Sequence, residues 1–537
     1  MKRWSRKVWE VPIRGSPRTV LPRTEGHASA LWVQSRSWAV TSSSSLNEER
    51  GILPYEAIPS TGRNGWVNLY RLWMSDGIRN VHHVMTRNFN RLGPIYREKL
   101  GSKDSINIFQ PEDIAVLFQS EGAFPKRLML DPWVAHREYR NLQCGIFLKN
   151  GKEWRSERLV LNKEVICLTA VSKFAPFLEP VAQEFTQFVD RQLEAGHGVS
   201  EVNMMPDLFR FALESSFNLL YGKRLGLFAD QVCPSSERFI GAVEDMLRTT
   251  IPLLHLPLQL VKRLNMKPWR DHVAAWDILF EHADQCVEQL VQKFKNTLEV
   301  QQEYSGILSE LLLHSKLPVD IIKANVTELM VGSVDTTAHS LLFTLFELAR
   351  NPSVQSTLHD EVTAAYQDAQ GDVCKLLHSV PLLRGAIKET LRLYPIGITL
   401  QRYPIRDIVI QNYHIPAGTL VQAGLYSLGR CPDTFPDPQR YNPGRWLTSD
   451  GNYFRALAFG FGVRQCIGRR IAETEIALFL IHILRKFQII TRSKADLKLI
   501  YGFIVMVDCP PLLTFRPIDR QNQGLLTKAP GCSQLQP

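Results

Sequence analysis

The sequence predicts a mostly α-helical fold with a small β region. Two observations support this prediction: apolar residues recur with the helical period over long stretches, and strand-like segments are short and few. The helical pattern dominates beyond residue 111 and covers residues 181–192, 269–298, 318–350 and 382–394. Asn351-Pro352 should end the third stretch and Pro395 the fourth, because proline lacks the N–H group that continues a helix.

The strand signals lie in the last third of the chain. Residues 408–410 and 419–422 lie on either side of a turn sequence, Pro416-Ala417-Gly418, and a second pair covers residues 503–507 and 512–515. No internal repeat is visible. The sequence therefore predicts only a small β portion.

Composition narrows the class of protein. The 537 residues are 45% apolar and 22% charged, as in ordinary globular proteins, and the length alone suggests several domains. Nine scattered cysteines form no Cys-x-x-Cys pair, which argues against a zinc ribbon, a thioredoxin-like site or a disulfide framework. The net charge of +10 suits an acidic protein partner, an anionic membrane or nucleic acid, but no nucleic-acid recognition motif is present.

The N-terminal segment, residues 1–47, differs from the rest in composition. It holds eight basic residues, two acidic residues and nine serines. This bias is typical of a mitochondrial transit peptide, and no apolar run is long enough for a secretory signal core or a membrane span. A basic tail that binds nothing in particular is the alternative. The bias ends between Arg36 and Arg50, where cleavage is expected.

A cysteine loop at residues 459–470 is the most informative segment. Cys466 is surrounded by three glycines and followed by a helical stretch at 471–484, so backbone N–H groups, the helix dipole and Arg464 should stabilise its thiolate. Such a thiolate can be a nucleophile, a metal ligand or neither. A nucleophile would need a histidine, and His482 is the one histidine that follows; zinc would need further thiolate or imidazole ligands. A single thiolate suits haem iron.

The full pattern Phe459-x-x-Gly462-x-Arg464-x-Cys466-x-Gly468 resembles the ligand-loop signature of the cytochrome P450 family of haem-thiolate monooxygenases. The resemblance covers essentially the whole chain after about residue 50. It implies the cytochrome P450 fold, with haem b as cofactor and Cys466 as the axial ligand of its iron. It also implies three parts: the transit peptide at 1–47, one haem-thiolate monooxygenase domain at 48–518, and a polar tail at 519–537 that is expected to be disordered.

Two further motifs of the family lie upstream of the cysteine loop. Glu389 and Arg392 share one face of an apolar helix, and the resemblance implies that Arg445 joins them in a structural lock around the haem-binding core. Polar Asp335 and Thr336 interrupt the long apolar helix and are similar to the family's oxygen-activation pair, which relays protons toward dioxygen at the haem. A helix kink or a satisfied core threonine is the alternative for that segment.

The resemblance also implies residues for the haem propionates and for the substrate. The residues expected to hold the propionate carboxylates are one tryptophan and three arginines, which form charge-assisted hydrogen bonds with carboxylates: Trp154, Arg158, Arg402 and Arg464. A mostly apolar steroid pocket with a few polar anchors would be lined by Trp133, Arg137, Phe147, Glu328 and Phe503. Ordinary core packing is the alternative for each of these aromatic residues. Val331 stands where the resemblance leads us to expect a smaller alanine beside the oxygen groove, and Thr399 stands where mammalian members carry phenylalanine. These two departures leave the regioselectivity open.

Within the family, this chain resembles the mitochondrial class, because it carries a basic presequence in place of an N-terminal membrane helix. Members of that class receive electrons from a small acidic ferredoxin of the adrenodoxin type. Its docking surface would be the basic residues that flank the cysteine side of the haem, Arg384, Lys388, Arg469 and Arg470. An ordinary solvated face is the alternative.

The runs at 130–137, 344–352, 411–422 and 425–430 resemble the group of steroid 11-beta-hydroxylases and aldosterone synthases. The group implies conversion of 11-deoxycorticosterone and 11-deoxycortisol to corticosterone and cortisol with molecular oxygen, and leaves onward conversion to aldosterone open. Cholesterol side-chain cleavage and sterol or vitamin D hydroxylation are alternatives that use the same machinery. A haem protein that is not an oxygenase is the alternative of a different class.

An apolar segment at residues 251–261 is too short to span a bilayer. We expect it to dip into the matrix side of the inner mitochondrial membrane, where an apolar substrate dissolves. An internal core segment is the alternative. The sequence thus predicts a peripheral enzyme of that membrane.

Overall fold

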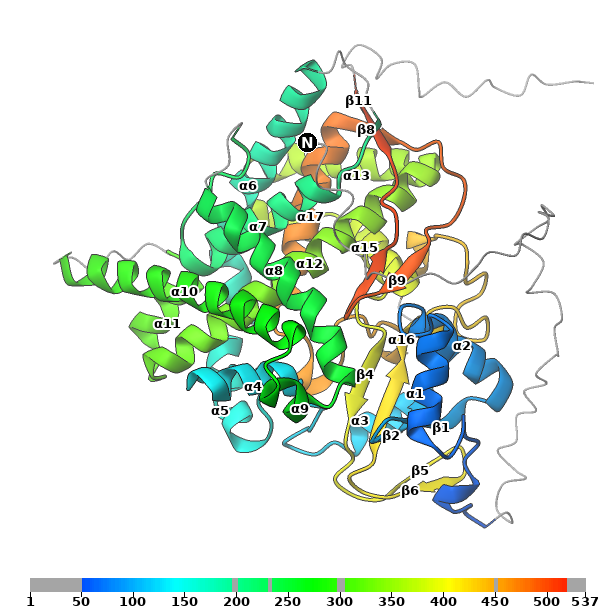
Figure 1. The fold of residues 1–537 in the computed structure, drawn as a ribbon. Helices are drawn as coiled ribbons and strands as arrows, with labels where there is room; N and C mark the ends of the chain where they lie inside the picture. Colours follow the sequence, from blue (N-terminus) through cyan, green and yellow to red (C-terminus); the bar gives the residue numbers. More distant parts are fainter. Residues whose placement is uncertain (1–50, 196–200, 230–233, 297–304, 449–452, 519–537) are drawn as a thin grey trace, which may run out of the picture. The chain divides into compact units, whose positions relative to one another are not determined.

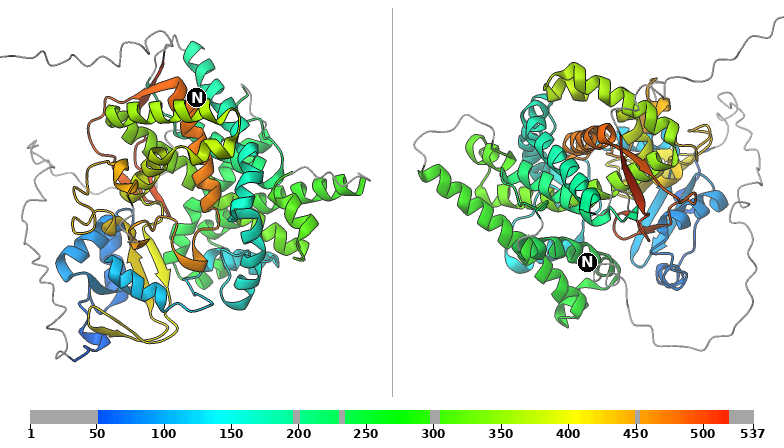
Figure 2. Two further views of the ribbon diagram at one scale, coloured as in Figure 1. Left: turned by 180° about the vertical axis from the view of Figure 1, so that it is seen from behind. Right: turned by 90° about the horizontal axis from the view of Figure 1, so that it is seen from above.

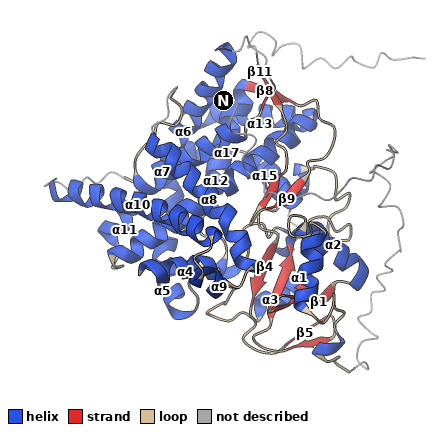
Figure 3. Ribbon diagram, viewed as in Figure 1, coloured by secondary structure: helices blue, strands red, loops and turns tan. Residues whose placement is uncertain are grey.

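The computed structural model describes residues 51–195, 201–229, 234–296, 305–448 and 453–518 (Figure 1). The expected transit peptide at 1–47 and the expected tail at 519–537 lie outside these residues. From Ile52 onward the chain forms one compact unit. Helices make up most of it, and the strands are short (Figure 3).

The long helices form where the apolar period predicts them. The helices of the described residues are α1 (Gly65–Met74), α2 (Val81–Leu92), α3 (Pro111–Gln119), α4 (Asp131–Arg140), α5 (Gly151–Val165), α6 (Leu168–Ala195), α7 (Met205–Tyr221), α8 (Pro234–His255), α9 (Leu258–Arg263), α10 (Lys267–Asn296), α11 (Ile307–His314), α12 (Val319–Arg350), α13 (Pro352–Ala369), α14 (Val373–His378), α15 (Pro381–Leu393), α16 (Leu425–Leu428) and α17 (Arg469–Lys486). The predicted stretches therefore correspond to α6, α10, α12, α15 and α17. Helix α6 is much longer than predicted, because it continues through Pro176 and Pro180.

The strands lie in two regions of the fold (Figure 2): yellow and light-blue strands lie beside the blue helices α1 and α2, whereas red strands lie close to the orange helix α17. They are β1 (Ile95–Leu100), β2 (Lys103–Ile108), β3 (Glu201–Val202), β4 (Thr399–Arg402), β5 (Ile408–Ile410), β6 (Tyr413–Ile415), β7 (Leu420–Gly424), β8 (Phe487–Ile490), β9 (Leu499–Tyr501), β10 (Val505–Val507) and β11 (Leu513–Pro517). The largest sheet has the order β1-β2-β7-β4, with β2 and β7 parallel and the other pairs antiparallel.

The pairing of the predicted strands was not visible in the sequence. The turn at 416–418 joins β6 to β7, while β5 pairs with β6, so the two predicted strands lie in different sheets. Likewise β10 pairs with β9 and β11 with β8 and β3. Helices α1 and α2 and strands β1 and β2 were also missed. Helix α1 is rich in apolar residues, but most of its large ones, such as Trp66, Tyr70 and Trp73, are exposed.

Helix α12 runs through the core and carries the predicted oxygen-activation pair. Among the described residues it is the single helix that is long and apolar enough to cross a membrane, and the bent pair α5 and α6 meets the same criteria jointly. The most apolar window of α12 is 78% buried inside the protein, as expected for a core helix. It packs against α7, α15 and α17 in the larger apolar core, and a second core fills the space between α3 and the four-stranded sheet.

Candidate active site

The cysteine loop is a tight turn that leads into α17. Gly460 and Gly462 have φ angles of 73° and 67°, in the left-handed region that glycine adopts without strain. The Cys466 N–H donates to the Phe459 carbonyl at 2.7 Å, which closes the loop. Helix α17 begins three residues after Cys466, with Gly468 as its N-cap. The predicted position of Cys466, just before a helix N-terminus, is confirmed.

The side chain of Cys466 is accessible although much of the protein surrounds it. Burial by the surrounding protein raises the pKa of the thiol. The Gly468 N–H and the guanidinium groups of Arg158 and Arg127 act in the opposite direction. The nearby cations that bear on the thiol are thus Arg158 and Arg127, whereas the sequence suggested Arg464. A thiol with a raised pKa is protonated at neutral pH, but it gives up its proton when it coordinates a metal ion.

His482 is held elsewhere in the fold. Its Nε2 lies 3.5 Å from a carboxylate oxygen of Glu179 in α6, and its ring packs edge-on against Tyr366 in α13. These contacts give no support to His482 as the base of a nucleophilic Cys466.

A cluster of arginines lies beside the cysteine loop. Arg158 donates to the Gln465 carbonyl at 2.8 Å, and Arg464 stacks 4.1 Å from the ring centre of Trp154 while donating to the carbonyls of Pro125 and Lys149. Arg402 donates to the buried carboxylate of Glu121. The structure therefore brings the four predicted propionate residues close to the cysteine loop, and it adds Arg127, which the sequence analysis missed.

The positive charge of this arginine cluster is only partly balanced by nearby carboxylates. Burial, together with repulsion from Arg127, Arg402 and Arg158, lowers the pKa of Arg464 to about 8, and Glu121 offsets part of the effect. Burial also lowers the pKa of Arg127 and of Arg158 to about 10. A group with two carboxylates would relieve this repulsion through charge-assisted hydrogen bonds. The residues present thus fit a haem, with its two propionates at the arginines and its iron at Cys466.

On α12, Gly332 and Thr336 lie one turn apart. Gly332 is exposed although the helix is a core helix, and no atom lies within 4 Å of the position that a Cβ would take there. The Thr336 hydroxyl is partly exposed and donates to the Gly332 carbonyl at 2.8 Å. The helix is therefore open at this turn, next to the predicted oxygen-activation pair.

Asp335 is buried next to this opening. Its Oδ2 has no hydrogen-bond partner among the described residues. Burial, and secondarily the negative charge of Glu244 in α8, raises the pKa of Asp335 to about 8. The carboxyl group is therefore mostly protonated at neutral pH and can donate a proton.

Three of the predicted steroid-contacting residues form an aromatic cluster. The Trp133 ring lies 5.5 Å from that of Phe147 and 5.7 Å from that of Phe503, and the Trp133 indole N–H donates to the Thr250 hydroxyl at 2.8 Å. Phe503 has a φ of 77°, an uncommon value for a non-glycine residue. The cluster joins α4, the loop after it and the loop before β10.

The other two predicted substrate residues have different contacts. The Arg137 guanidinium is buried 3.6 Å from the ring centre of Trp276 in α10. Glu328 of α12 accepts hydrogen bonds from the backbone N–H groups of Gly145 and Phe147. Arg137 thus packs against α10, and Glu328 holds the loop that carries Phe147.

The predicted lock around Glu389 is present as a buried ion-pair network. The Glu389 carboxylate accepts from Arg392 at 2.8 and 2.9 Å, from Arg445 at 2.9 Å and from the Trp446 indole at 2.9 Å. Arg392 also donates to the carbonyls of Gly429, Pro438 and Arg440. Although burial by itself raises the pKa of Glu389, the hydrogen bonds and charges of Arg392, Asn442 and Arg445 lower it below the usual value.

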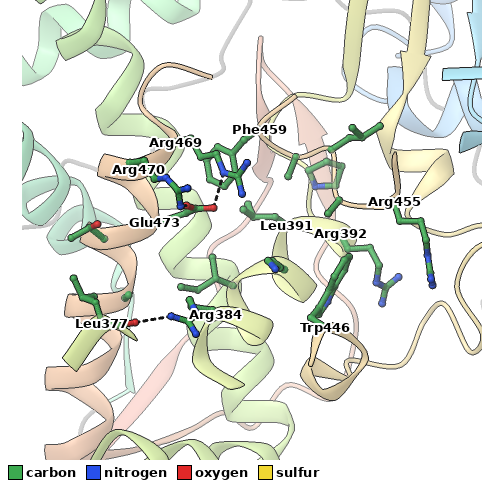
Figure 4. A pocket seen from close by; sticks show the side chains of 18 of the residues that line it. Leu377, Arg384, Leu391, Arg392, Trp446, Arg455, Phe459, Arg469, Arg470 and Glu473 are labelled. Carbon is green, nitrogen blue, oxygen red and sulfur yellow. Dashed lines mark hydrogen bonds and ion pairs between the residues drawn. The ribbon is translucent and has the colours of Figure 1, made fainter. Parts of the chain in front are cut away.

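The four predicted docking cations line one cavity. It has a volume of about 380 Å³ and lies between α15, the loop before the cysteine and the start of α17 (Figure 4). Arg469 and Arg470 both pair with Glu473, at 2.9 and 3.2 Å, while Arg384 donates to the Leu377 carbonyl. Burial, with repulsion from Arg469 and Arg384, lowers the pKa of Lys388 despite the opposing effect of Glu473.

One further buried acid was missed in the sequence. Glu475 of α17 is 1% exposed, and burial raises its pKa well above the usual value, although the hydroxyls of Ser215 and Thr337 oppose this effect. It is therefore a neutral acid next to α12. The signal was available, because its helical neighbours Ile471 and Phe479 are apolar. Arg127 gave no such signal, since it lies in an irregular segment.

Comparison with known proteins extends the geometric picture. The sequence profile described as Cytochrome P450 matches residues 59–515. The chain is 55% identical over 467 residues to "Cytochrome P450 11B, mitochondrial" of Aquarana catesbeiana, with 87% of this chain and 90% of that protein covered. It is 48% identical over 465 residues to "Cholesterol side-chain cleavage enzyme, mitochondrial" of Oncorhynchus mykiss (86% and 90% covered). The protein of the same name from Homo sapiens is 45% identical over 471 residues (87% and 90% covered).

Proposed function

The chain belongs to the cytochrome P450 family, and we propose that it is a mitochondrial steroid 11β-monooxygenase. The proposed reaction converts 11-deoxycorticosterone and 11-deoxycortisol to corticosterone and cortisol. The observation that carries this choice is the 55% identity to a protein named P450 11B, against 48% and 45% to proteins named for side-chain cleavage. The aromatic cluster of Trp133, Phe147 and Phe503 supports it, because flat apolar rings suit a steroid skeleton.

Haem is the cofactor of this family, and we assign its axial thiolate to Cys466. When bound, it supplies the chemistry that inserts one atom of dioxygen into a C–H bond and releases the other as water, with two electrons from the donor. The residues of the chain do the rest. The arginine cluster holds the propionates, the aromatic cluster positions the steroid, and Asp335 and Thr336 deliver protons at the opening of α12.

Replacing Asp335 with asparagine is expected to lower turnover by about a hundredfold or more, because a general acid contributes roughly that much. The pKa of about 8 for Asp335 sets the pH dependence. Wild-type turnover should fall as the pH rises above about 8, where the carboxyl group loses its proton, and the variant should lack this step. The measurement is steady-state turnover from pH 6 to about 9.5.

The matched control for this experiment is Ser333→Ala. Ser333 lies on the same helix, and its hydroxyl donates to the Met330 carbonyl within that helix. Its variant should keep the wild-type pH profile. An Asp335→Asn protein with wild-type turnover and pH profile would exclude the proposed proton delivery.

The substrate is tested by reconstitution with an adrenodoxin-type ferredoxin, its reductase and NADPH. The protein is incubated in parallel with 11-deoxycorticosterone, 11-deoxycortisol and cholesterol, and the products are identified by mass and by comparison with standards. Corticosterone and cortisol are expected, and aldosterone would show that oxidation continues to carbon 18. Side-chain cleavage is the second candidate, favoured by the relatives of that name; a product from cholesterol without corticosterone would replace our proposal with it.

The cations around the 380 Å³ cavity are the proposed docking surface for the ferredoxin (Figure 4). Burial, with repulsion from Arg469 and Arg384, lowers the pKa of Lys388, and an acidic partner would offset the repulsion. The surface lies next to the cysteine loop, so an electron donor bound there would be close to the thiolate side of the haem.

Replacing Lys388 with glutamate is expected to raise the KM for the ferredoxin by about tenfold or more, because a like charge then faces the acidic donor. Steroid binding should be unchanged. The measurement is the ferredoxin dependence of turnover at low and high salt. Arg516→Glu, at an exposed cation on β11, is the charge-matched control. If both substitutions raise the KM for the ferredoxin equally, Lys388 acts only through the net charge of the protein, and the proposed docking surface is wrong.

We place the enzyme on the matrix side of the inner mitochondrial membrane, with a peripheral contact through the segment 251–266. Part of the predicted apolar segment is buried and part is exposed. Leu253 and Val261 are buried in a small core with Trp269. The exposed leucines are Leu256, Leu260 and Leu264. The core alternative therefore holds for part of the segment, and the proposed contact moves to α9 and its flanks.

The double substitution Leu260→Ser and Leu264→Ser is expected to weaken binding to liposomes by about tenfold, since two exposed leucines no longer enter the bilayer interface. The control carries Leu159→Ser and Leu512→Ser, two leucines that are similarly exposed on other elements. Co-sedimentation with vesicles measures the difference. Equal binding of the two double variants would refute a contact through α9.

A further inference from the structure

The loop between α4 and α5, residues 141–150, is held against α12 by three consecutive backbone N–H groups. The Gly145 N–H donates to Glu328 Oε1 at 2.8 Å, the Ile146 N–H to Asn325 Oδ1 at 2.8 Å, and the Phe147 N–H to Glu328 Oε2 at 2.9 Å. Asn325 and Glu328 are separated by one helical turn, so their side chains share a face of α12. Two side chains thus satisfy three successive donors of an irregular segment.

The approach of the loop to α12 is close enough to require glycine. A Cβ at Gly145 would lie 2.5 Å from Glu328 Oε2 and 2.9 Å from the Ala324 carbonyl oxygen. The second of these is a backbone atom, which cannot move aside without displacing the helix. The contact therefore depends on the absence of a side chain at position 145.

The orientation of the Asn325 amide is fixed at both ends. Its Nδ2 donates to Glu157 Oε2 at 3.1 Å and to the Ile321 carbonyl at 2.8 Å, which leaves Oδ1 to accept from Ile146. Asn325 is fully buried. Glu157 in turn accepts from the Lys149 ammonium group, in the same loop. A buried amide with all of these hydrogen bonds made is strongly positioned.

The same loop reaches the two parts of the active site. Its Phe147 ring belongs to the aromatic cluster with Trp133, and its Phe147 carbonyl accepts from the Arg127 guanidinium. Its Lys149 carbonyl and Asn150 side chain each accept from Arg464, at 2.6 Å. The loop thus supplies one wall of the proposed steroid pocket and holds two members of the arginine cluster.

We propose that Asn325 and Glu328 form a clamp that positions the loop 141–150. Asn325 in particular is a positioning residue that acts through this loop. It positions the steroid-contacting ring of Phe147 and the propionate-binding Arg127 and Arg464. The part that concerns the steroid rests on the proposed function. The part that concerns the loop and the haem does not depend on which steroid is bound.

The test uses the haem-loaded protein with Asn325→Leu, which keeps the branching and the number of heavy atoms of the side chain and removes its hydrogen bonds to the loop and to Glu157. Three quantities are measured: amide hydrogen exchange at residues 145–147 by mass spectrometry, the rate of haem transfer to apomyoglobin, and the dissociation constant for 11-deoxycorticosterone from the spectral shift that it causes. We expect exchange about tenfold faster, as for one lost buried hydrogen bond, with faster haem loss and weaker steroid binding.

Two variants make the result specific. Glu328→Gln turns one acceptor into a donor that faces a backbone N–H group. It should therefore speed amide exchange at residues 145 or 147 and also speed haem loss. This variant replaces Asn325→Leu in the test if Asn325→Leu does not fold. Thr327→Val is the control, because Thr327 is buried on the same helix and its hydroxyl donates within the helix, to the Lys323 carbonyl. It should leave all three quantities at wild-type values.

The outcomes separate the clamp from the proposed function. Faster exchange confined to the loop, with faster haem loss, supports the clamp. A folded Asn325→Leu or Glu328→Gln protein with wild-type exchange and haem retention overturns it. If the wild-type protein itself fails to bind 11-deoxycorticosterone, the proposed substrate is wrong, and exchange and haem loss still decide the clamp.

Discussion

Replacing Cys466 with alanine is expected to abolish monooxygenase activity and the red-shifted carbon monoxide band of the reduced protein. The thiolate is the proposed axial ligand, and its electron density favours cleavage of the O–O bond. We expect a loss on the order of a thousandfold or more, because changes to residues that only support a ligand already cost about 10–100-fold. The measurements are the carbon monoxide difference spectrum and turnover with 11-deoxycorticosterone.

The control for this experiment is Cys509→Ser, at an exposed cysteine near the C-terminal strands. It should keep both the band and the turnover. The arginine cluster remains in the Cys466→Ala protein, so haem should still bind to some extent and the spectrum can be recorded. A Cys466→Ala protein that retained the red-shifted band would refute the assignment of the ligand.

Replacing Glu389 with leucine is expected to produce the largest loss of stability. Arg392 and Arg445 would remain buried without their shared carboxylate, and breaking a buried ion pair by removing one partner costs about 3–5 kcal/mol. The protein should therefore unfold at a much lower urea concentration, or fail to accumulate with haem. The midpoint of unfolding, followed by far-ultraviolet circular dichroism and by haem absorbance, measures the effect.

The pH dependence gives a second readout with the milder variant Glu389→Gln. The folded protein lowers the pKa of Glu389 below the usual glutamate value of 4.5, so the carboxylate stabilises the fold fully above that pH. This contribution is lost as the pH falls below about 4.5 and through the lowered pKa. The stability difference between wild type and variant should therefore shrink on acidification. Glu473→Gln, at a partly exposed carboxylate on α17, is the control.

A wild-type unfolding midpoint for Glu389→Leu would show that the network does not hold this part of the fold.

Much of the site could be predicted because its signals are local. The cysteine loop is contiguous, and its backbone needs glycine at positions 460 and 462, where φ is positive. Glu389 and Arg392 are three residues apart, so the helix itself brings them together. The cores of α10, α12, α15 and α17 follow from the helical period of their apolar residues, which is a property of each segment alone.

Other features could not be predicted, because they depend on packing between distant segments. The clamp joins Ile146 to Asn325 across 179 positions, and no pattern in either segment points to the other. The exposure of Leu260 and the burial of Val261 depend on which side of α9 faces Trp269. Strand partners likewise escaped prediction, since β2 pairs in parallel with β7, a strand more than three hundred residues away.

The sequence by itself determined the helical class, the cysteine loop, the Glu389–Arg392 pair and the acid on α12, since each is specified by residue type and short spacing. The tertiary structure alone decided which cations surround Cys466, and it replaced Arg464 with Arg158 and Arg127 as the groups that act on the thiol. It also decided that Asp335 is a neutral acid and that Glu328 holds a loop. The physical reason is that a charge, a pKa and a hydrogen bond depend on everything packed around a group, whereas a helix or a turn depends on its own few residues.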